Sequence, residues 1–143
     1  MTRIDFYSLE PDSGGDRFIL TCRLVERIRG QDLRILIHCP DREQARHLDR
    51  LLWTYREDSF LPHGLVDSSD IALTPVLISA DGRPASEDQV LINLATEVPG
   101  FLDRFARVCE PIDQDPVIRA AGRARYRLYR ERGYPLEHHQ LRL

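Results

Sequence analysis

The sequence of 143 residues contains no lysine, so all 20 of its basic residues are arginine. It has only three cysteines, Cys22, Cys39 and Cys109, without CxxC spacing, which argues against a disulfide framework or a zinc site and for reduced thiols. No apolar run approaches the roughly 20 residues that span a bilayer. The start, MTRIDFYSLEPD, has acids where a signal peptide has basic and apolar residues. These absences predict a cytoplasmic protein.

Motifs for catalysis and cofactor binding are also missing. The loop LEPDSGGDR, after the first predicted strand, has neither GxGxxG nor the GK[ST] of a P-loop. His38 and Cys39 are adjacent on a predicted strand and point to opposite faces, which favours a packing pair over a catalytic pair. His138 and His139 have only Glu137 beside them, which favours a solvated tail over a metal site. We therefore expect no catalytic residues, no cofactor and no metal.

Strand and helix patterns alternate along what we interpret as one domain, residues 1–143. Alternating residues predict a strand at 3–9, and apolar runs predict strands at 33–39, 75–80 and 90–95. Residues 101–112 are ambiguous, because they begin as a helical pattern and continue as a strand pattern. Helical spacing predicts helices at 16–30, 41–53 and 116–132, followed by a short C-terminal tail. Strands separated by helices indicate an α/β fold with a mostly parallel sheet and helices on both faces.

Charge is divided unevenly along the chain, whose net charge is −3. Residues 117–143 hold seven arginines and two acids, a charge of +5, whereas the preceding 116 residues hold 13 arginines and 21 acids, a charge of −8. The basic excess is concentrated in RARYRLYRERGYP, residues 123–135. A protein that coats DNA is usually basic over a broad surface. The acidic remainder of the chain mildly favours a protein partner.

The last predicted helix has two contrasting faces at 100° per residue. One stripe is expected to pack on the core and consists of Val117, Ala121, Ala124 and Leu128. The opposite face is basic, with one aromatic ring, and consists of Arg119, Arg123, Tyr126, Arg127 and Arg130. No acid lies among these arginines to relieve their repulsion. The face therefore predicts an anionic partner, either nucleic acid or an acidic peptide; an acidic neighbour in the same domain is the remaining alternative.

A second stretch, LLWTYREDSFLPHG at residues 51–64, gathers large apolar residues just after a predicted helix end. It contains the only tryptophan of the chain, Trp53, followed by Tyr55, Phe60, Leu61 and Pro62. Such a group is either a satellite core or an exposed anchor patch for another protein. Composition alone leaves both alternatives open.

Several segments together resemble the chi subunit family of the bacterial DNA polymerase III holoenzyme, a clamp-loader accessory protein. The resemblance extends nearly end to end, with a weaker match over 64–89. It depends on the opening FY.L, on RILIHCPDREQARHLDRLLW, SFLPHGL and VLINL, and on the closing RARYRLYRERGY. The combination of LLW…SFLPH with RYRLYR is fairly specific, whereas either alone is weak.

The resemblance implies a non-catalytic adaptor with a Rossmann-like three-layer domain and no working nucleotide site. It implies a heterodimer with the psi subunit through Trp53, Phe60, Leu61 and Pro62, with Trp53 exposed in the free chain. It also implies that the acidic C-terminal tail of single-stranded DNA-binding protein (SSB) docks on the basic face, through Arg119, Arg123, Tyr126 and Arg127, with Ile112 or Val117 as apolar contacts. DNA is then reached indirectly through SSB. The alternative function is direct binding of single-stranded nucleic acid by the same basic face.

Overall fold

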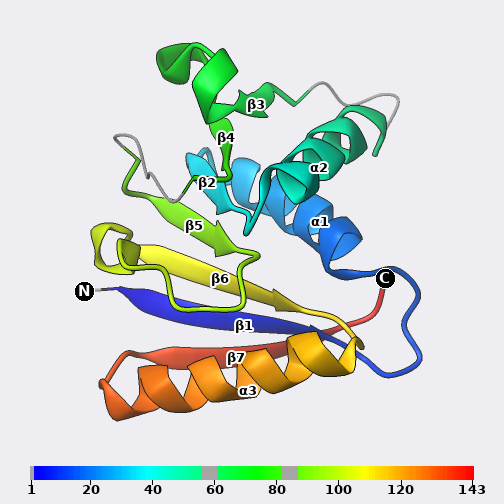
Figure 1. The fold of residues 1–143 in the computed structure, drawn as a ribbon, viewed down its shortest axis with the longest axis vertical. Helices are drawn as coiled ribbons and strands as arrows, with labels where there is room; N and C mark the ends of the chain where they lie inside the picture. The colour runs from blue at the N-terminus through cyan, green and yellow to red at the C-terminus, as the bar shows by residue number, and fades with distance from the viewer. Residues whose placement is uncertain (1, 56–60, 82–86) are drawn as a thin grey trace.

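A computed structural model describes residues 2–55, 61–81 and 87–143 of the chain (Figure 1). Its three helices are α1 (Arg17–Arg29), α2 (Arg42–Thr54) and α3 (Pro116–Glu131). Short 3₁₀ helices lie at Val66–Ser68, Ile71–Leu73 and Leu102–Arg104. The strands are β1 (Arg3–Leu9), β2 (Ile35–His38), β3 (His63–Leu65), β4 (Val76–Ser79), β5 (Val90–Asn93), β6 (Arg107–Ile112) and β7 (Leu136–Leu141).

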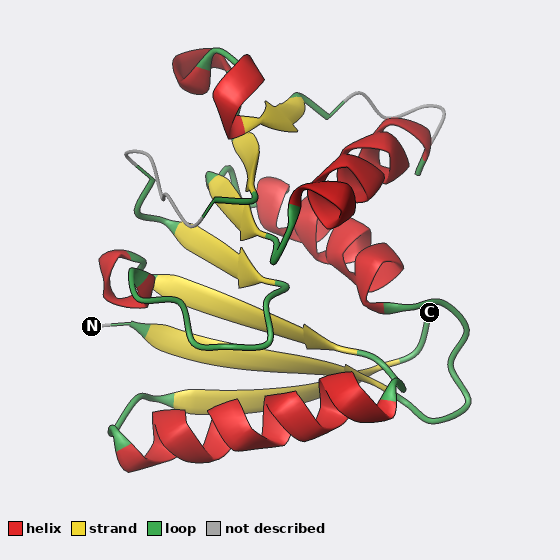
Figure 2. Cartoon of the chain, viewed as in Figure 1, coloured by secondary structure: helices red, strands yellow, loops and turns green. Residues whose placement is uncertain are grey.

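The strands form a seven-stranded sheet in the order β3-β4-β2-β5-β6-β1-β7, and neighbouring strands are parallel throughout (Figure 2). The central strands β2, β4 and β5 read ILIH, VLIS and VLIN. Such continuous apolar runs suit parallel strands, because helices cover both faces of the sheet. The predicted α/β class with a mostly parallel sheet is confirmed.

Two hydrophobic cores lie on opposite faces of this sheet. The first contains Leu20 and Leu24 of α1, Leu48 of α2, and Tyr7 and Leu9 of β1. The second contains Tyr129 of α3 with Ile4 and Phe6 of the same strand β1. Alternate residues of β1 thus belong to different cores, as the period-two geometry of a strand requires. The predicted placement of helices on both faces is confirmed.

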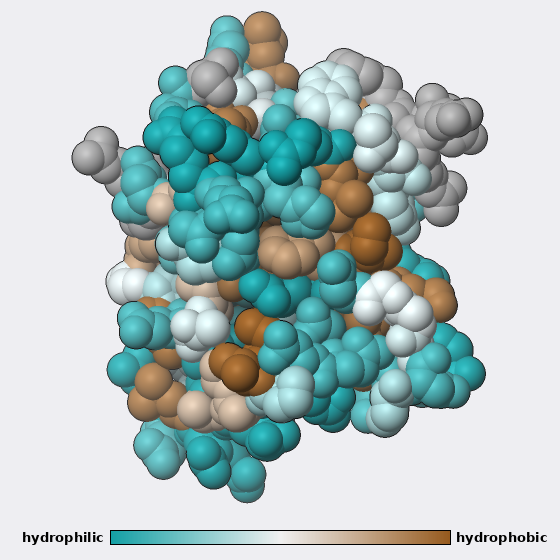
Figure 3. All heavy atoms as spheres, turned by 45° about the vertical axis from the view of Figure 1, so that its right-hand side comes forward, coloured by the Kyte–Doolittle hydropathy of each residue, from teal (hydrophilic) through white to brown (hydrophobic). Residues whose placement is uncertain are grey.

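The surface carries no long apolar face in the view of Figure 3. On the side shown, hydrophobic side chains form small groups that hydrophilic side chains separate. Across the described segments, none of the helices is both long enough and apolar enough to cross a membrane.

The short C-terminal tail expected after the last helix is instead a strand, although Glu137, His138 and Gln140 in it are exposed to solvent. Residues Leu136–Leu141 form β7, which pairs in parallel with β1 and places His138 opposite Phe6 and His139 opposite Tyr7. The chain crosses over β1 through α3 to reach this edge position. The strand was missed because an edge strand with polar residues at 137–140 lacks the apolar alternation that predicts a strand. The three-residue β3 was also not predicted.

The core-facing stripe predicted for α3 is also wrong, because the buried positions lie one residue further along the helix. Val117 is 70% exposed and Ala124 is exposed. Buried instead are Gly122, Arg125 and Tyr129. The helix is therefore rotated by about 100° from the predicted orientation. The cause is the buried acid Glu110 of β6, which draws an arginine of α3 to the sheet.

Candidate docking site on the last helix

The basic face of α3 borders a pocket of about 290 Å³, which we call the α3 pocket. Strands β1, β6 and β7 contribute part of its wall, and α3 contributes the rest. Its lining consists of Phe6, Ser8, Ile112, Arg119, Gly122, Arg123, Tyr126 and His138. The structure thus brings together four of the residues predicted for the docking site, namely Ile112, Arg119, Arg123 and Tyr126.

The floor of the α3 pocket is apolar because α3 approaches the sheet closely at a glycine. A Cβ atom added to Gly122 would lie 2.7 Å from Cδ1 of Ile112, so a larger residue here would displace that side chain or fill the hollow beside it. The ring of Tyr126 meets Phe6 edge-on, with centroids 5.2 Å apart. Phe6, Ile112 and Tyr126 therefore present rings and methyl groups that suit an apolar side chain.

One polar contact at the edge of the α3 pocket was not predicted from the sequence. Ser8 Oγ and His138 Nε2 lie 2.8 Å apart and share a hydrogen bond between β1 and β7. These two residues are close because β1 and β7 pair with each other. The residues at 136–141 do not predict a strand, so the sequence did not indicate this contact.

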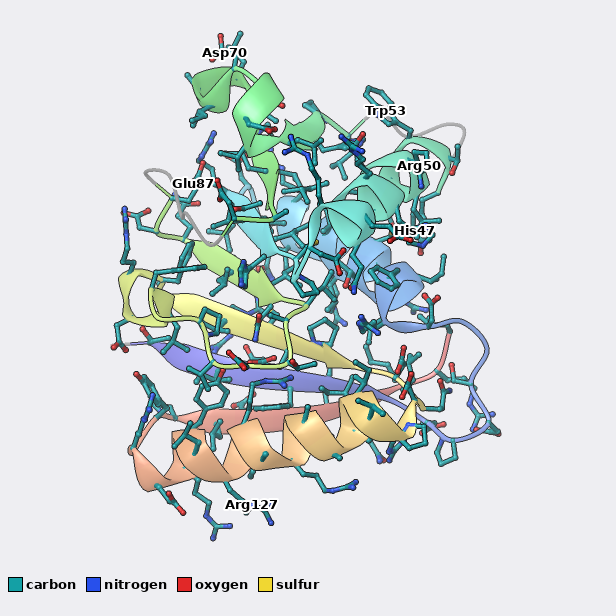
Figure 4. The ribbon with its side chains drawn as sticks, in the orientation of Figure 1. His47, Arg50, Trp53, Asp70, Glu87 and Arg127 are labelled. Atoms are coloured by element: carbon teal, nitrogen blue, oxygen red, sulfur yellow. The ribbon has the colours of Figure 1, made fainter. Side chains whose placement is uncertain are left out.

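The arginines of this face are available to a partner. Arg119, Arg123, Arg127 and Arg130 have no ion-pair or hydrogen-bond partner for their side chains among the described residues. An acidic neighbour in the described part of the same domain is therefore not what balances their charge. Arg119 and Arg123 border the α3 pocket, whereas Arg127 projects from the outer side of α3, away from the sheet (Figure 4). Val117 is exposed but does not line the pocket.

A buried ionic network holds α3 in this orientation. Glu110 is 0% exposed, and its carboxylate accepts hydrogen bonds from Arg125 Nη2 at 3.0 Å, Tyr129 Oη at 2.6 Å and Asn93 Nδ2 at 3.1 Å. Arg125 Nη1 also donates to the carbonyl oxygen of Thr96 at 2.7 Å. Burial raises the pKa of Glu110, while Arg125, Tyr129 and Asn93 favour its charged form. Because the network seats Arg125 inward, its neighbours Arg123 and Tyr126 lie at the α3 pocket.

The amino end of α1 has its backbone donors already occupied, although this is where many α/β folds bind phosphate. Asp16 accepts hydrogen bonds from the N–H groups of Phe18 and Ile19, both at 3.0 Å. Asp113 accepts from the N–H of Arg17 at 2.9 Å. Two carboxylates here repel a phosphate and take the donors that it would need.

His38 and Cys39 contact different parts of the protein, as predicted. The ring of His38 meets Phe101 edge-on at 5.2 Å, whereas Cys39 belongs to the core beneath α1 and α2. Burial raises the pKa of the Cys39 thiol to about 12 and has the same effect on Cys22 and Cys109. The three thiols are therefore protonated at neutral pH, which makes them poor nucleophiles.

The second predicted patch lies at the far end of α2 from the α3 pocket. The exposure expected of Trp53 is confirmed, since 55% of it is accessible and it projects from α2 (Figure 4). Its ring lies 4.6 Å from that of His63, which starts β3. Leu61 and Pro62 are half-buried, and Phe60 lies outside the described residues.

Comparison with known proteins identifies the family. The family model for the DNA polymerase III chi subunit, HolC, matches residues 1–137. The chain belongs to the DNA polymerase III chi subunit family. This chi-family chain is 40% identical to DNA polymerase III subunit chi of Pseudomonas aeruginosa over 141 residues, covering 99% of this chain and 98% of that protein. It is 30% identical to the subunit chi of Escherichia coli K12, covering 95% and 96%, and 30% identical to that of Haemophilus influenzae, covering 82% of each.

The fold of this chi-family chain also occurs in a protein outside the family. Domain 2 of the Mss116p DEAD-box helicase, bound to an RNA duplex, superposes with a TM-score of 0.57 at 12% sequence identity. The match covers 98% of this chain but only 64% of that one. At such low identity the likeness shows the fold alone.

Proposed function

We propose that this chain is a non-catalytic adaptor of DNA polymerase III that links the clamp loader to SSB. The α3 pocket is the docking site for the acidic C-terminal tail of SSB. A patch that contains Trp53, Leu61 and Pro62, here called the Trp53 patch, faces psi or an equivalent clamp-loader element. The protein acts in the cytoplasm, without a cofactor or an active site of its own. The observation that supports this proposal best is the combination of an apolar floor with unpaired arginines at the α3 pocket.

The chemistry of the pocket suits a tail that ends in several aspartates, an apolar-Pro-Phe segment and a free carboxylate, as the family resemblance implies. Guanidinium groups of Arg119 and Arg123 bind carboxylates through paired N–H donors. The hollow between Ile112 and Tyr126 takes the phenylalanine ring. Exposed ion pairs contribute little each and weaken with salt, so affinity is modest, on the order of micromolar. Several tails on one DNA strand strengthen the attachment through effective concentration.

The pocket arginines can be distinguished from the outer ones by calorimetry with the C-terminal peptide of the SSB from the same source. We expect the Arg119→Ala, Arg123→Ala double variant to raise the Kd about tenfold, because it removes two exposed ion pairs that each contribute up to about 1 kcal/mol. The Arg127→Ala, Arg130→Ala double variant removes the same charge outside the pocket. It should change the Kd only about two- to threefold. These arginines act on the peptide only through long-range attraction, which salt screens within about 10 Å at 0.1 M.

The same titration tests the alternative function. Lack of peptide binding by the unmodified protein would contradict tail docking. Tight binding of a bare single-stranded oligonucleotide, lost equally in both double variants, would favour direct nucleic-acid recognition by the whole basic face.

The Trp53 patch is tested separately, by measuring association with psi from the same source. We expect Trp53→Ala to weaken the complex at least about tenfold, because an exposed tryptophan that becomes buried is a typical hot spot. Arg46→Ala, an exposed change on the same helix α2, is the control. Equal affinities of the two variants for psi would remove Trp53 from the interface, while leaving tail docking unaffected.

A further inference from the structure

A second pocket lies on the opposite face of the sheet from the α3 pocket. It has a volume of about 390 Å³ and is formed by α1 together with strands β1, β6 and β7; we call it the α1 pocket. It is lined by Arg3, Tyr7, Leu24, Arg27, Ile28, Gln31, Arg107, His139, Gln140 and Leu141. Nothing proposed above for SSB or psi uses this pocket.

Arg107 is held rigidly beside the α1 pocket by two contacts. Its Nε donates to Asp5 Oδ2 at 2.9 Å, and its Nη2 donates to Tyr7 Oη at 2.5 Å. Within the described part of the chain, no hydrogen-bond partner is found for its third nitrogen, Nη1. Arg27 of α1 likewise has no side-chain partner there. The pocket therefore presents one preoriented and one unpaired guanidinium group.

The charge balance of the α1 pocket favours an anion over a metal ion. Asp5, Glu137 and His139 offer ligand atoms within 4.8 Å of one another, which could in principle hold a cation. Asp5, however, already pairs with Arg3 at 3.2 Å and with Arg107 at 2.9 Å. These guanidiniums and the nearby Arg27 repel a cation. The three arginines carry more positive charge than Asp5 and Glu137 carry negative charge, so the net charge at the pocket is positive.

The remaining features favour a compact phosphate over an extended polyanion. Pockets for small ligands have volumes of about 300–1,000 Å³, and this one lies within that range. The ring of His139 stacks on Tyr7 with centroids 4.7 Å apart and planes 16° apart, which provides a flat surface at the pocket. The surrounding chain, residues 1–116, carries a charge of −8, which disfavours a long nucleic-acid backbone. We propose that the α1 pocket binds the phosphate group of a small phosphorylated ligand, such as a nucleotide.

The proposal can be tested by titrating the full chain with pyrophosphate and with AMP at low salt, followed by amide chemical shifts. We expect saturable shifts in α1 and β7, with an apparent Kd at least tenfold higher in Arg27→Gln. Arg27 is exposed, so this change should leave the fold intact. Arg46→Gln on α2 is the matched control and should bind like the unmodified protein, as should the Arg119→Ala, Arg123→Ala variant.

Three results would overturn the proposal. The first is no saturable shift at millimolar pyrophosphate and AMP, and the second is an unchanged Kd in Arg27→Gln. The third is that succinate or a bare oligothymidylate binds as tightly as the phosphate ligands, or more tightly, and that this binding depends on Arg27. Such binding of succinate would identify a carboxylate site, and such binding of the oligothymidylate a nucleic-acid site. Because the α3 pocket is intact in Arg27→Gln, SSB-tail binding by this variant remains measurable, so failure here is separate from failure of the adaptor function.

Discussion

Replacing Arg125 with alanine will lower the free energy of unfolding by about 3–5 kcal/mol, the typical cost of removing one partner from a buried ion pair. The change removes the charge partner of Glu110, a fully buried carboxyl group, and leaves it only Tyr129 and Asn93 as donors. It also leaves the carbonyl oxygen of Thr96 without the donor that it has now. A loss of this size is a large share of the roughly 5–15 kcal/mol that stabilises an ordinary domain.

Urea unfolding, with Arg123→Ala as control, measures this effect. Arg123 lies two residues away on the same helix but is exposed, so its replacement should change stability by no more than about 0.5 kcal/mol. Replacing Arg125 and Glu110 together by methionine and leucine should restore much of the loss, because apolar pairs of similar volume are often as stable as a buried ion pair. A loss below 1 kcal/mol in Arg125→Ala would mean that the network does not anchor α3.

The error in the orientation of α3 has a specific physical cause. The predicted stripe Val117, Ala121, Ala124 and Leu128 becomes the buried face when each position is moved by one residue, to Ile118, Gly122, Arg125 and Tyr129. Arginine is usually exposed, so hydrophobic periodicity favoured the stripe of small apolar residues. The signal that could have corrected it is Glu110, the single acid of the strand RVCEPI, because an acid in a buried strand requires a partner of opposite charge.

Other parts of the fold were predictable where the residues of an element themselves show its pattern. The buried strands β2, β4 and β5 are short apolar runs, and α1 and α2 have N-cap residues, Asp16 and Asp41, at their predicted starts. The edge strands β3 and β7 depend on pairing with distant residues, which no local pattern encodes. The residues of the α3 pocket come from four separate elements, so the sequence indicated the basic face but not the hollow beside it.

The network and the pocket are two consequences of one helix orientation. Inward placement of Arg125 and Tyr129 puts Gly122, one helical turn before Tyr126, against Ile112, and the missing side chain there leaves the α3 pocket open. Stability and the proposed docking function therefore depend on neighbouring residues of α3 but can be altered independently.

Replacing Gly122 with leucine will raise the Kd for the SSB tail peptide by about 10- to 100-fold. The new side chain occupies the hollow, so the peptide loses the burial of its phenylalanine ring, worth about 1.5–3 kcal/mol. Overpacking against Ile112 costs about 1–3 kcal/mol, offset in part by the roughly 1 kcal/mol that leucine gains over glycine in a helix. We therefore expect a folded protein, to be verified by circular dichroism before calorimetry.

Ala120→Leu is the matched control, because Ala120 is exposed on the same helix and does not line the pocket. It adds the same side chain without filling the hollow and should leave the Kd unchanged. Since Arg119 and Arg123 are retained in Gly122→Leu, its residual binding should still weaken as salt rises. Unchanged affinity in a folded Gly122→Leu protein would show that the tail is held by charge along α3 alone, and the α3 pocket would lose its proposed role.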